Sequence, residues 1–154
     1  MKKIVEILTK ENKTISTMES CTGGLVASCI TDIEGASEVL KFSAVTYSNE
    51  YKIKMGVDSK IIDKYSVYSI ETAKSMAKSI SKFSSSNYGI GVTGKLNRVD
   101  PNNLFNDDST IYVSIYDKDN QKYYNKVLKA IKDTRLENKK YIVKEIEDLL
   151  ISIF

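Results

Sequence analysis

The segment 20–24 reads SCTGG and brings a hydroxyl, a thiol and two glycines together between a β-rich run and a predicted helix. Backbone N–H groups at the start of a helix have no intrahelical partners, and the helix dipole adds positive potential there. Two glycines let a ligand approach the backbone closely. A nucleophilic Ser20 would therefore have oxyanion donors beside it, as acyl transfer requires. The same pattern also fits a tight turn with a Ser or Thr helix cap, or a phosphate cradle.

A nucleophilic serine needs a base, and the chain contains no histidine to act as one. The remaining choices are lysine, tyrosine or a carboxylate. Lys52 stands out because it falls in the first turn after the second predicted strand. Partial burial and the positive end of a helix both disfavour the ammonium form, so Lys52 is a candidate general base. A solvated lysine without a catalytic role fits the same position.

Other groups offer alternative chemistry. Cys21 is a rival nucleophile, because a thiolate at a helix N-terminus is also activated, although a cysteine there is more often a small packed side chain. Glu19 fits either a base or a metal ligand. Three aspartates of the longest predicted loop fit a divalent-cation site, although polar loops are commonly acidic without binding metal: Asp100, Asp107 and Asp108. We expect neither a metal nor another cofactor, because backbone amides would already stabilise an oxyanion.

Length and composition exclude several classes of protein. The 154 residues are 42% hydrophobic and 28% charged, which predicts one globular domain over residues 1–154. The absence of histidine excludes Ser-His-Asp triads and argues against a zinc site. A net charge of +3, spread evenly, argues against a nucleic-acid partner, and no run is apolar enough to span a membrane. Two cysteines without a disulfide framework and a charged N-terminus lead us to expect a cytoplasmic protein.

The elements that must position these residues follow from the apolar pattern. Short β-rich runs predict strands in five places: 14–19, 42–48, 88–94, 110–116 and 123–128. Apolar residues at three- and four-residue steps predict four helices: 4–8, 25–30, 70–83 and 142–153. We expect Ser69 to cap the third of these helices and Asn49 to cap a short helix after the second strand. Strands and helices alternate in the first part of the chain, and a hairpin of two strands follows later. This order predicts an α/β fold with helices on both faces of a mixed sheet.

The segment 17–24, TMESCTGG, resembles the T-x-E-S-C-T-G-G signature of the C-terminal domain of CinA (competence/damage-inducible) proteins. The resemblance covers nearly the whole chain through five further blocks: 35–37 (GAS), 45–52 (VTYSNEYK), 56–57 (GV), 67–73 (VYSIETA) and 91–94 (GVTG). It implies a single three-layer α/β/α domain with amidohydrolase activity on nicotinamide mononucleotide. That reaction converts the carboxamide to a carboxylate and releases ammonia in pyridine nucleotide salvage.

The resemblance also implies roles for individual residues. Ser20 matches the family's nucleophile and Lys52 its base. Tyr47 and Asn49, in the same block as Lys52, are expected to orient it or to contact the substrate. Thr93 matches the threonine of the family's V-T-G turn, close to the nucleophile. The rest of the signature is expected to bind substrate: Cys21, Thr22, Gly23 and Gly24.

Two positions depart from the family pattern. After V-T-G the family usually continues with a glycine-rich I-A-G-P-G-G loop, whereas this chain reads KLNRVDPNN at 95–103. Arg98 is a candidate to contact a substrate phosphate in place of those glycines. Arg135 matches the first arginine of a C-terminal R-x-x-x-R pair that would meet the phosphate, and Lys139 replaces the second. Three hypotheses therefore remain: the family reaction, an amidase with another substrate, or a nucleotide-binding module without turnover. Assembly with further copies of the chain is left open.

Overall fold

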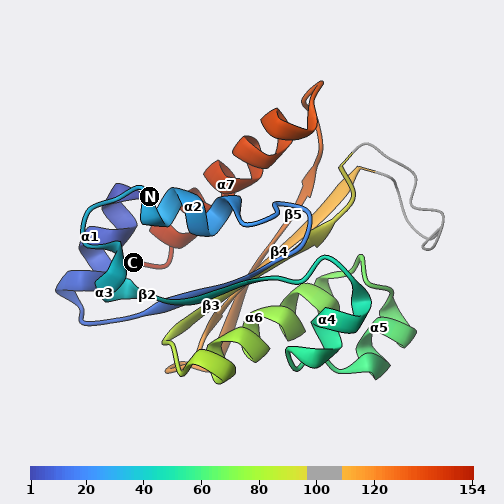
Figure 1. Cartoon of the computed structure of the whole chain (residues 1–154), viewed down its shortest axis with the longest axis horizontal. Helices are drawn as coiled ribbons and strands as arrows, with labels where there is room; N and C mark the ends of the chain where they lie inside the picture. The colour runs from blue at the N-terminus through green and yellow to red at the C-terminus, as the bar shows by residue number, and fades with distance from the viewer. Residues whose placement is uncertain (97–108) are drawn as a thin grey trace.

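The computed structural model describes residues 1–96 and 109–154. Their strands form one five-stranded sheet in the order β2-β1-β3-β4-β5 (Figure 1). The first three strands are parallel and the last two antiparallel: β1 (Ile15–Glu19), β2 (Leu40–Val45), β3 (Tyr88–Gly94), β4 (Thr110–Asp117) and β5 (Lys122–Lys129). The prediction of a mixed sheet with a late hairpin is confirmed, and β3 is central as its uncharged sequence indicated.

Helices cover both faces of the sheet (Figure 1). One face carries four of them: α1 (Lys2–Lys10), α2 (Leu25–Thr31), α3 (Ala36–Val39) and α7 (Arg135–Ile151). The opposite face carries the other three: α4 (Asn49–Lys54), α5 (Ser59–Tyr65) and α6 (Ile70–Ser84). The predicted three-layer α/β/α fold is therefore confirmed. None of these helices is long and apolar enough to cross a membrane.

Each helical layer buries its own set of apolar side chains against the sheet. On the α1–α2–α7 side, Ile30 and Ile146 belong to one cluster with Ile90 of β3. On the α6 side, Met76 and Ile80 pack with Met18 of β1. Successive residues of a strand point to opposite faces, so a fully buried strand such as β1 contributes to both layers. This alternation also decides to which side the polar residues at its end can point.

Two glycines of β3 explain how closely α6 lies on the sheet. A Cβ added at Gly91 would lie 2.2 Å from the Ala73 carbonyl oxygen, and one at Gly89 would lie 2.0 Å from that of Ala77. No backbone could tolerate such contacts, so any side chain at these positions would push the helix away. The small residues on both elements hold α6 against β3 and thereby fix the loops at the carboxyl ends of the parallel strands.

Some local predictions were wrong. The second strand ends at Val45 rather than at residue 48. Ser48, not Asn49, caps α4, because its side chain accepts a hydrogen bond from the Tyr51 N–H while Asn49 is already helical. Phe83 was predicted on the buried face of the third helix, but it is 62% exposed and stacks on the half-exposed edge-strand residue Phe42. The short helices α3 and α5 were not predicted, since neither contains enough turns to show a period.

Candidate active site

The carboxyl ends of the three parallel strands meet at one edge of the sheet. From β1 the chain crosses to β2 on one side, and β3 lies on the other, so β1 stands at a topological switch point. The Ser20 N–H donates to the Val92 carbonyl at 3.0 Å, and the Thr46 N–H donates to the Glu19 carbonyl at 2.8 Å. Ligands of open α/β sheets bind in the crevice at this position. The segments that follow β1, β2 and β3 therefore converge where a site is expected.

Ser20 and Lys52, predicted from separate motifs, are in direct contact. The Lys52 ammonium donates to the Ser20 Oγ at 3.1 Å and to the Thr46 carbonyl oxygen at 2.7 Å. The Lys52 side chain is 1% exposed, and within residues 1–96 and 109–154 no carboxylate pairs with it. The hydrogen bond to the Thr46 carbonyl thus fixes the position of the Lys52 nitrogen. Another hydrogen-bonding direction of the same nitrogen points to the Ser20 hydroxyl.

Burial lowers the pKa of Lys52 from 10.5 to about 8. A contribution from the positive end of a helix is also expected: Lys52 belongs to the short helix α4, and its ammonium reaches back to the Thr46 carbonyl, which precedes the Ser48 N-cap. That contribution stays a prediction. Burial raises the pKa of the neighbouring Cys21 to about 12. Near neutral pH, Lys52 is therefore neutral for an appreciable fraction of the time, whereas Cys21 stays a thiol. This contrast favours Ser20 over Cys21 as the nucleophile.

The side chain of Glu19 occupies most of the helix N-terminus that follows the site. One carboxylate oxygen accepts the N–H groups of Gly24 and Val26, each at 3.1 Å, and the other accepts that of Ala27 at 2.9 Å. The Thr17 hydroxyl donates to the same carboxylate at 3.3 Å. The expectation that these helix amides are free is therefore wrong. The hypotheses of Glu19 as base or metal ligand also fail, because all four lone-pair directions are already used.

The turn between β1 and α2 nevertheless keeps two amides available. The Ser20 N–H is used by β3, and the Gly23 N–H donates to the Ser20 carbonyl at 3.0 Å. Within the described part of the chain, the backbone N–H groups of Cys21 and Thr22 have no acceptor from another residue. They follow the serine directly, which is where the nucleophile elbow of other hydrolases has an oxyanion donor.

Two cations of α7 lie at the rim of this turn. The Arg135 guanidinium donates to the Leu96 carbonyl at 3.0 Å and to the Tyr47 hydroxyl at 3.3 Å. The Lys139 ammonium, one turn further along α7, lies against Gly23: a Cβ at that glycine would be 3.2 Å from it. Gly23 has a φ of +63°, so it needs to be a glycine both for its backbone and for this contact.

Of the other predicted site residues, two are buried and two are exposed: Thr93 and Thr22, and Tyr47 and Asn49. Thr93 is buried beside the serine and donates its hydroxyl to the Val67 carbonyl at 3.0 Å. Thr22 is buried, and its hydroxyl has no partner among the described residues. Tyr47 is 66% exposed and its hydroxyl accepts a hydrogen bond from Arg135, whereas Lys52 donates to Ser20 and Thr46. The structure thus gives no support to Tyr47 orienting Lys52, and the alternative, that Tyr47 contacts the substrate, stays a prediction. Asn49 is exposed at the start of α4, with no side-chain hydrogen bond in the described ranges.

Some candidates lie outside the described residues: Arg98, Asp100, Asp107 and Asp108. Within residues 1–96 and 109–154, no group of three Asp, Glu, Cys or His side chains is placed to hold a metal ion. Sequence reasoning missed Thr46, whose carbonyl holds Lys52 and whose buried hydroxyl has no partner in the described ranges. A backbone acceptor has no residue-type signature, so only its position directly after a strand could have indicated it.

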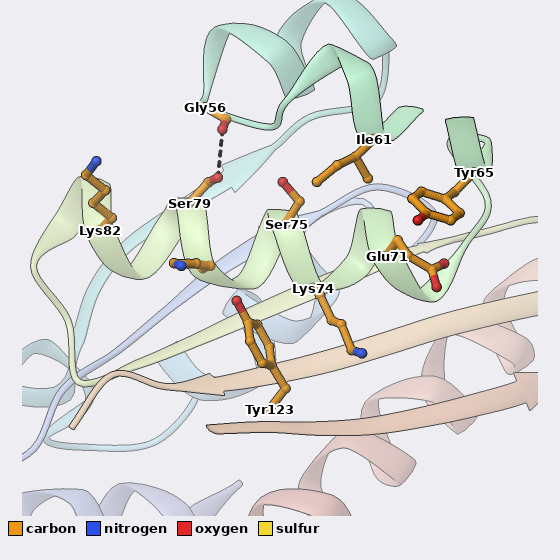
Figure 2. A pocket seen from close by; sticks show the side chains of 10 residues that line it. Gly56, Ile61, Tyr65, Glu71, Lys74, Ser75, Ser79, Lys82 and Tyr123 are labelled. Carbon is orange, nitrogen blue, oxygen red and sulfur yellow. Dashed lines mark hydrogen bonds between the residues drawn. The ribbon is translucent and has the colours of Figure 1, made fainter. Parts of the chain in front are cut away.

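A hollow elsewhere in the molecule contains none of these residues. It measures about 510 Å³ and lies over the outer side of α6 (Figure 2). Ser75 and Tyr65 line it toward α5, while Lys74 and Tyr123 line it toward β5. The Ser79 hydroxyl at its edge donates to the Gly56 carbonyl at 2.9 Å. No hydrogen bond between a nucleophile and a base, like that of Ser20 and Lys52, is found among the residues that line it.

Comparison of the amino-acid sequence with known protein families gives a match over almost the whole chain. The profile of the CinA C-terminal domain matches residues 1–152. The chain belongs to the CinA C-terminal domain family. This family contains amidases.

A "Putative competence-damage inducible protein" of Thermoanaerobacter sp. (strain X514) is 42% identical over 92 residues, which are 59% of this chain and 22% of the relative. A "CinA-like protein" of Endomicrobium trichonymphae is 47% identical over 89 residues, 57% of this chain and 21% of the relative. The matched region thus spans about a fifth of these relatives.

Solved structures agree with the CinA assignment over almost the full chain. The competence/damage inducible protein CihA from Agrobacterium tumefaciens superposes with a TM-score of 0.89 and 27% identity, covering 97% of this chain and 90% of that one. A CinA superfamily protein from Escherichia coli also gives a TM-score of 0.89 at 20% identity, covering 99% of this chain and 87% of that one. The second likeness concerns the fold alone.

Proposed function

We propose that this CinA-family chain is a Ser/Lys amidohydrolase that converts nicotinamide mononucleotide to nicotinate mononucleotide and ammonia. The observation that carries the proposal is the buried contact between Ser20 Oγ and Lys52 Nζ at 3.1 Å, with the pKa of Lys52 lowered to about 8. An ordinary lysine, with a pKa of about 10.4, is neutral for less than about a thousandth of the time at pH 7. With a pKa of about 8, about a tenth of the molecules carry a neutral Lys52 at pH 7.

In the first half of the reaction, Ser20 Oγ attacks the carbonyl carbon of the carboxamide while its proton passes to the neutral amine of Lys52. The amine keeps its hydrogen bond to the Thr46 carbonyl, so its lone pair faces the serine. The carbonyl oxygen becomes an oxyanion, which the N–H groups of Cys21 and Thr22 would stabilise. The carbon–nitrogen bond then breaks, the Lys52 ammonium returns the proton to the leaving nitrogen, and ammonia departs.

The second half regenerates the enzyme. Water attacks the acyl group on Ser20, and Lys52 accepts a proton from that water. The second tetrahedral intermediate collapses, the ester bond to Ser20 Oγ breaks, and the Lys52 ammonium returns a proton to the serine. The products are a carboxylic acid, which gives its proton to the solvent to become the carboxylate, and a free Ser20–Lys52 pair. Every proton transfer uses the same nitrogen, which is why one lysine is sufficient without a histidine.

The cationic rim supports a substrate with a phosphate. Arg135 and Lys139 extend from successive turns of α7 toward the loops around Ser20. A guanidinium offers five donors in a rigid fork, and two of these already hold it in place through Leu96 and Tyr47. The remaining donors would bind the phosphate of a mononucleotide while its ring reaches the serine.

Ammonia release from nicotinamide mononucleotide, measured in a coupled assay, tests the proposal. We expect turnover by the purified chain and none by Ser20→Ala prepared in parallel, which controls for contaminating amidases. A panel of the riboside, the free base and simple amides distinguishes the other hypotheses. Ammonia from one of these but not from the nucleotide would indicate an amidase with another substrate. Binding of the nucleotide without any turnover would indicate a binding module.

A further inference from the structure

Glu19 has a carboxylate that is completely buried yet takes no part in the proposed proton transfers. A buried charge is costly unless it is well partnered, so its retention next to a nucleophile needs a reason. Its partners are three backbone N–H groups of one helix start and one hydroxyl. Gly24, the N-cap residue of α2, has no side chain and cannot cap the helix itself. Glu19 therefore performs the capping from the strand that precedes the helix.

The alternation of strand β1 separates this carboxylate from the reacting groups. Glu19 points to the sheet face that carries α2, because its partners are the amides of that helix. Ser20, the next residue, reaches Lys52 of α4, which covers the opposite face. The Glu19 carboxylate is consequently bound by backbone N–H groups on one side of the sheet. The Ser20 hydroxyl and the Lys52 amine meet on the other side. Among residues 1–96 and 109–154, Lys52 thus has no carboxylate partner, as its proposed role as base requires.

The capping by Glu19 also decides which amides remain free. With the N–H groups of Gly24, Val26 and Ala27 bound to the carboxylate, the start of α2 is fixed in place. The five residues 20–24 that connect it to β1 must then form a tight turn, closed by the hydrogen bond from the Gly23 N–H to the Ser20 carbonyl. In that turn only the Cys21 and Thr22 amides lack an acceptor from another described residue.

We propose that Glu19 is a positioning residue: its carboxylate fixes the start of α2 so that the Cys21 and Thr22 amides form the oxyanion hole beside Ser20. The inference rests on the proposed Ser20 chemistry, but not on the identity of the substrate. Loss of the carboxylate would raise the transition-state barrier while substrate binding through the α7 cations persists. The defect should therefore be in kcat rather than in KM.

The test compares Glu19→Gln with the unmodified protein. Glutamine has the same size but places an NH₂ group against backbone N–H donors, so at least one of these hydrogen bonds is lost. We expect kcat to fall by roughly 10- to 1000-fold, the effect of disturbing an oxyanion-hole donor, with KM changed less than about threefold. Asp58→Ala is the matched control, because it removes the capping carboxylate of α5. It should lower the melting temperature and leave kcat unchanged.

A serine-directed fluorophosphonate gives a readout that needs no substrate. Ser20 Oγ attacks phosphorus, its proton passes to Lys52, the phosphorus–fluorine bond breaks, and fluoride leaves. Glu19→Gln should react more slowly by the same factor as its loss in kcat. If nicotinamide mononucleotide is not turned over but Ser20 is still labelled, the substrate assignment fails and the inference on Glu19 stands. Labelling of folded Glu19→Gln at the unmodified rate would overturn the inference.

The unmodified protein provides a test that does not depend on how the variant folds. In its ¹H–¹⁵N spectrum, formation of the phosphonyl adduct should shift the amide signals of Cys21 and Thr22, which face the phosphoryl oxygen. The signals of Gly24, Val26 and Ala27 should move much less, since their N–H groups remain bound to Glu19. The reverse pattern would place the oxyanion hole on the helix amides and contradict the proposed role of Glu19.

Discussion

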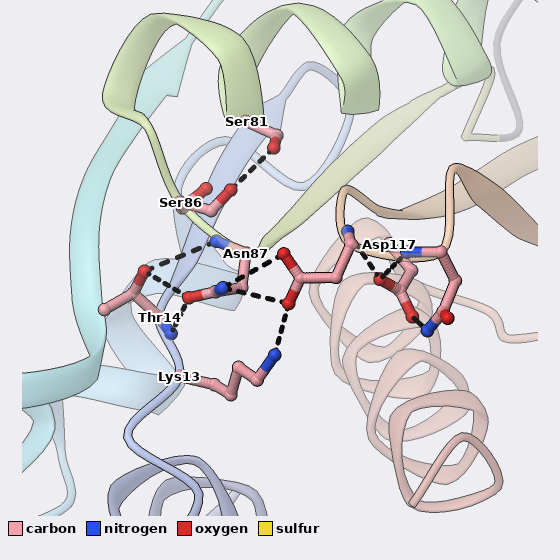
Figure 3. Close-up of polar contacts among 8 residues, drawn as sticks. Lys13, Thr14, Ser81, Ser86, Asn87 and Asp117 are labelled. Carbon is pink, nitrogen blue, oxygen red and sulfur yellow. Dashed lines mark hydrogen bonds and ion pairs between the residues drawn. The ribbon is translucent and has the colours of Figure 1, made fainter.

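A lysine stands beside each end of strand β1, and the two lysines differ in burial and in partner. At the amino end, Lys13 forms an ion pair with Asp119, whose carboxylate also accepts a hydrogen bond from the Asn87 side chain at 3.2 Å (Figure 3). The hydrogen bond to Asp119 raises the pKa of Lys13. At the carboxyl end, Lys52 is buried, donates to two neutral oxygens, and has its pKa lowered to about 8.

The difference separates a junction that holds the fold from one that can do chemistry. Around Lys13 the polar atoms satisfy one another: the Asn87 side chain accepts the Thr14 N–H at 3.0 Å and donates to Asp119 (Figure 3). Around Lys52, two buried hydroxyls, those of Thr22 and Thr46, have no partner among the described residues. A carboxylate beside Lys52 would keep it protonated and inactive as a base. The proposed role of Lys52 as a base therefore requires that it lack a carboxylate partner such as the one Lys13 has, and none is found among the described residues.

The largest effect is expected from the nucleophile. Ser20→Ala should lower kcat by roughly 10³- to 10⁶-fold while the protein stays folded, because the covalent route is lost. Cys21→Ser should change kcat little, since the Cys21 thiol, with a pKa of about 12, is not ionised near neutral pH. Steady-state kinetics with circular dichroism on both variants makes the comparison. An active Ser20→Ala beside an inactive Cys21→Ser would reverse the assignment.

Removing the base should have the next largest effect. Lys52→Met keeps the bulk without the amine, and Lys52→Arg keeps a charge that cannot lose its proton. Both should lower kcat by roughly 10²- to 10⁴-fold, the usual contribution of general acid–base catalysis. In the unmodified protein, kcat/KM should rise with pH and level off above about 8, as Lys52 loses its proton. A fully active Lys52→Arg protein would exclude the general-base role.

For Lys52→Met we also predict the direction in which the free energy of unfolding changes with pH. The pKa of Lys52 is lower in the folded protein than in the unfolded chain, so the fold is penalised below pH 8 and gains stability between about pH 8 and 10.5. Lys52→Met should abolish that gain. At pH 7 this substitution removes the cost of burying a charged ammonium, which is at most about 3 kcal/mol. It also leaves the Thr46 carbonyl without its hydrogen-bond donor, which costs about 1–3 kcal/mol. The free energy of unfolding at pH 7 should therefore be unchanged or higher, as urea titrations at pH 7 and 10 would show.

Much of this contrast could be predicted from sequence, but not the contacts that complete it. The strands and longer helices follow from local periodicity, and Ser20 and Lys52 follow from motifs in which residue type carries the information. Glu19 was assigned the wrong chemistry because its role depends on backbone amides that only the folded turn brings together. Tyr47 was expected to orient Lys52 or to contact the substrate because the two residues share one block of the family pattern, and its contact with Arg135, 88 residues away, could not be read from that block. Long-range polar contacts have no local signature.

A smaller effect is expected at the rim of the site. Arg135→Ala should reduce the preference for nicotinamide mononucleotide over its riboside by about 10- to 100-fold, since a hydrogen bond to a charged group contributes about 1.5–3 kcal/mol. Lys140→Ala, which removes an exposed charge from the same helix, is the control for nonspecific electrostatics. The ratio of kcat/KM for the two substrates is the measurement. An unchanged ratio in Arg135→Ala would remove Arg135 from the phosphate site.

The smallest effect is expected at the amino end of β1, where the polar groups are structural. Asp119→Asn should leave kcat and KM unchanged and lower the melting temperature slightly at pH 7, because an exposed ion pair contributes little. The hydrogen bond from Lys13 lowers the pKa of Asp119, so its stabilisation is present above pH 4 and is lost as pH falls through the folded pKa. Melting temperatures of the two proteins should therefore converge as the pH falls through the lowered folded pKa of Asp119, and their difference at pH 7 should shrink in 1 M salt. A loss of turnover in Asp119→Asn would mean that the two ends of β1 are coupled, and the division between a structural end and a chemical end would no longer hold.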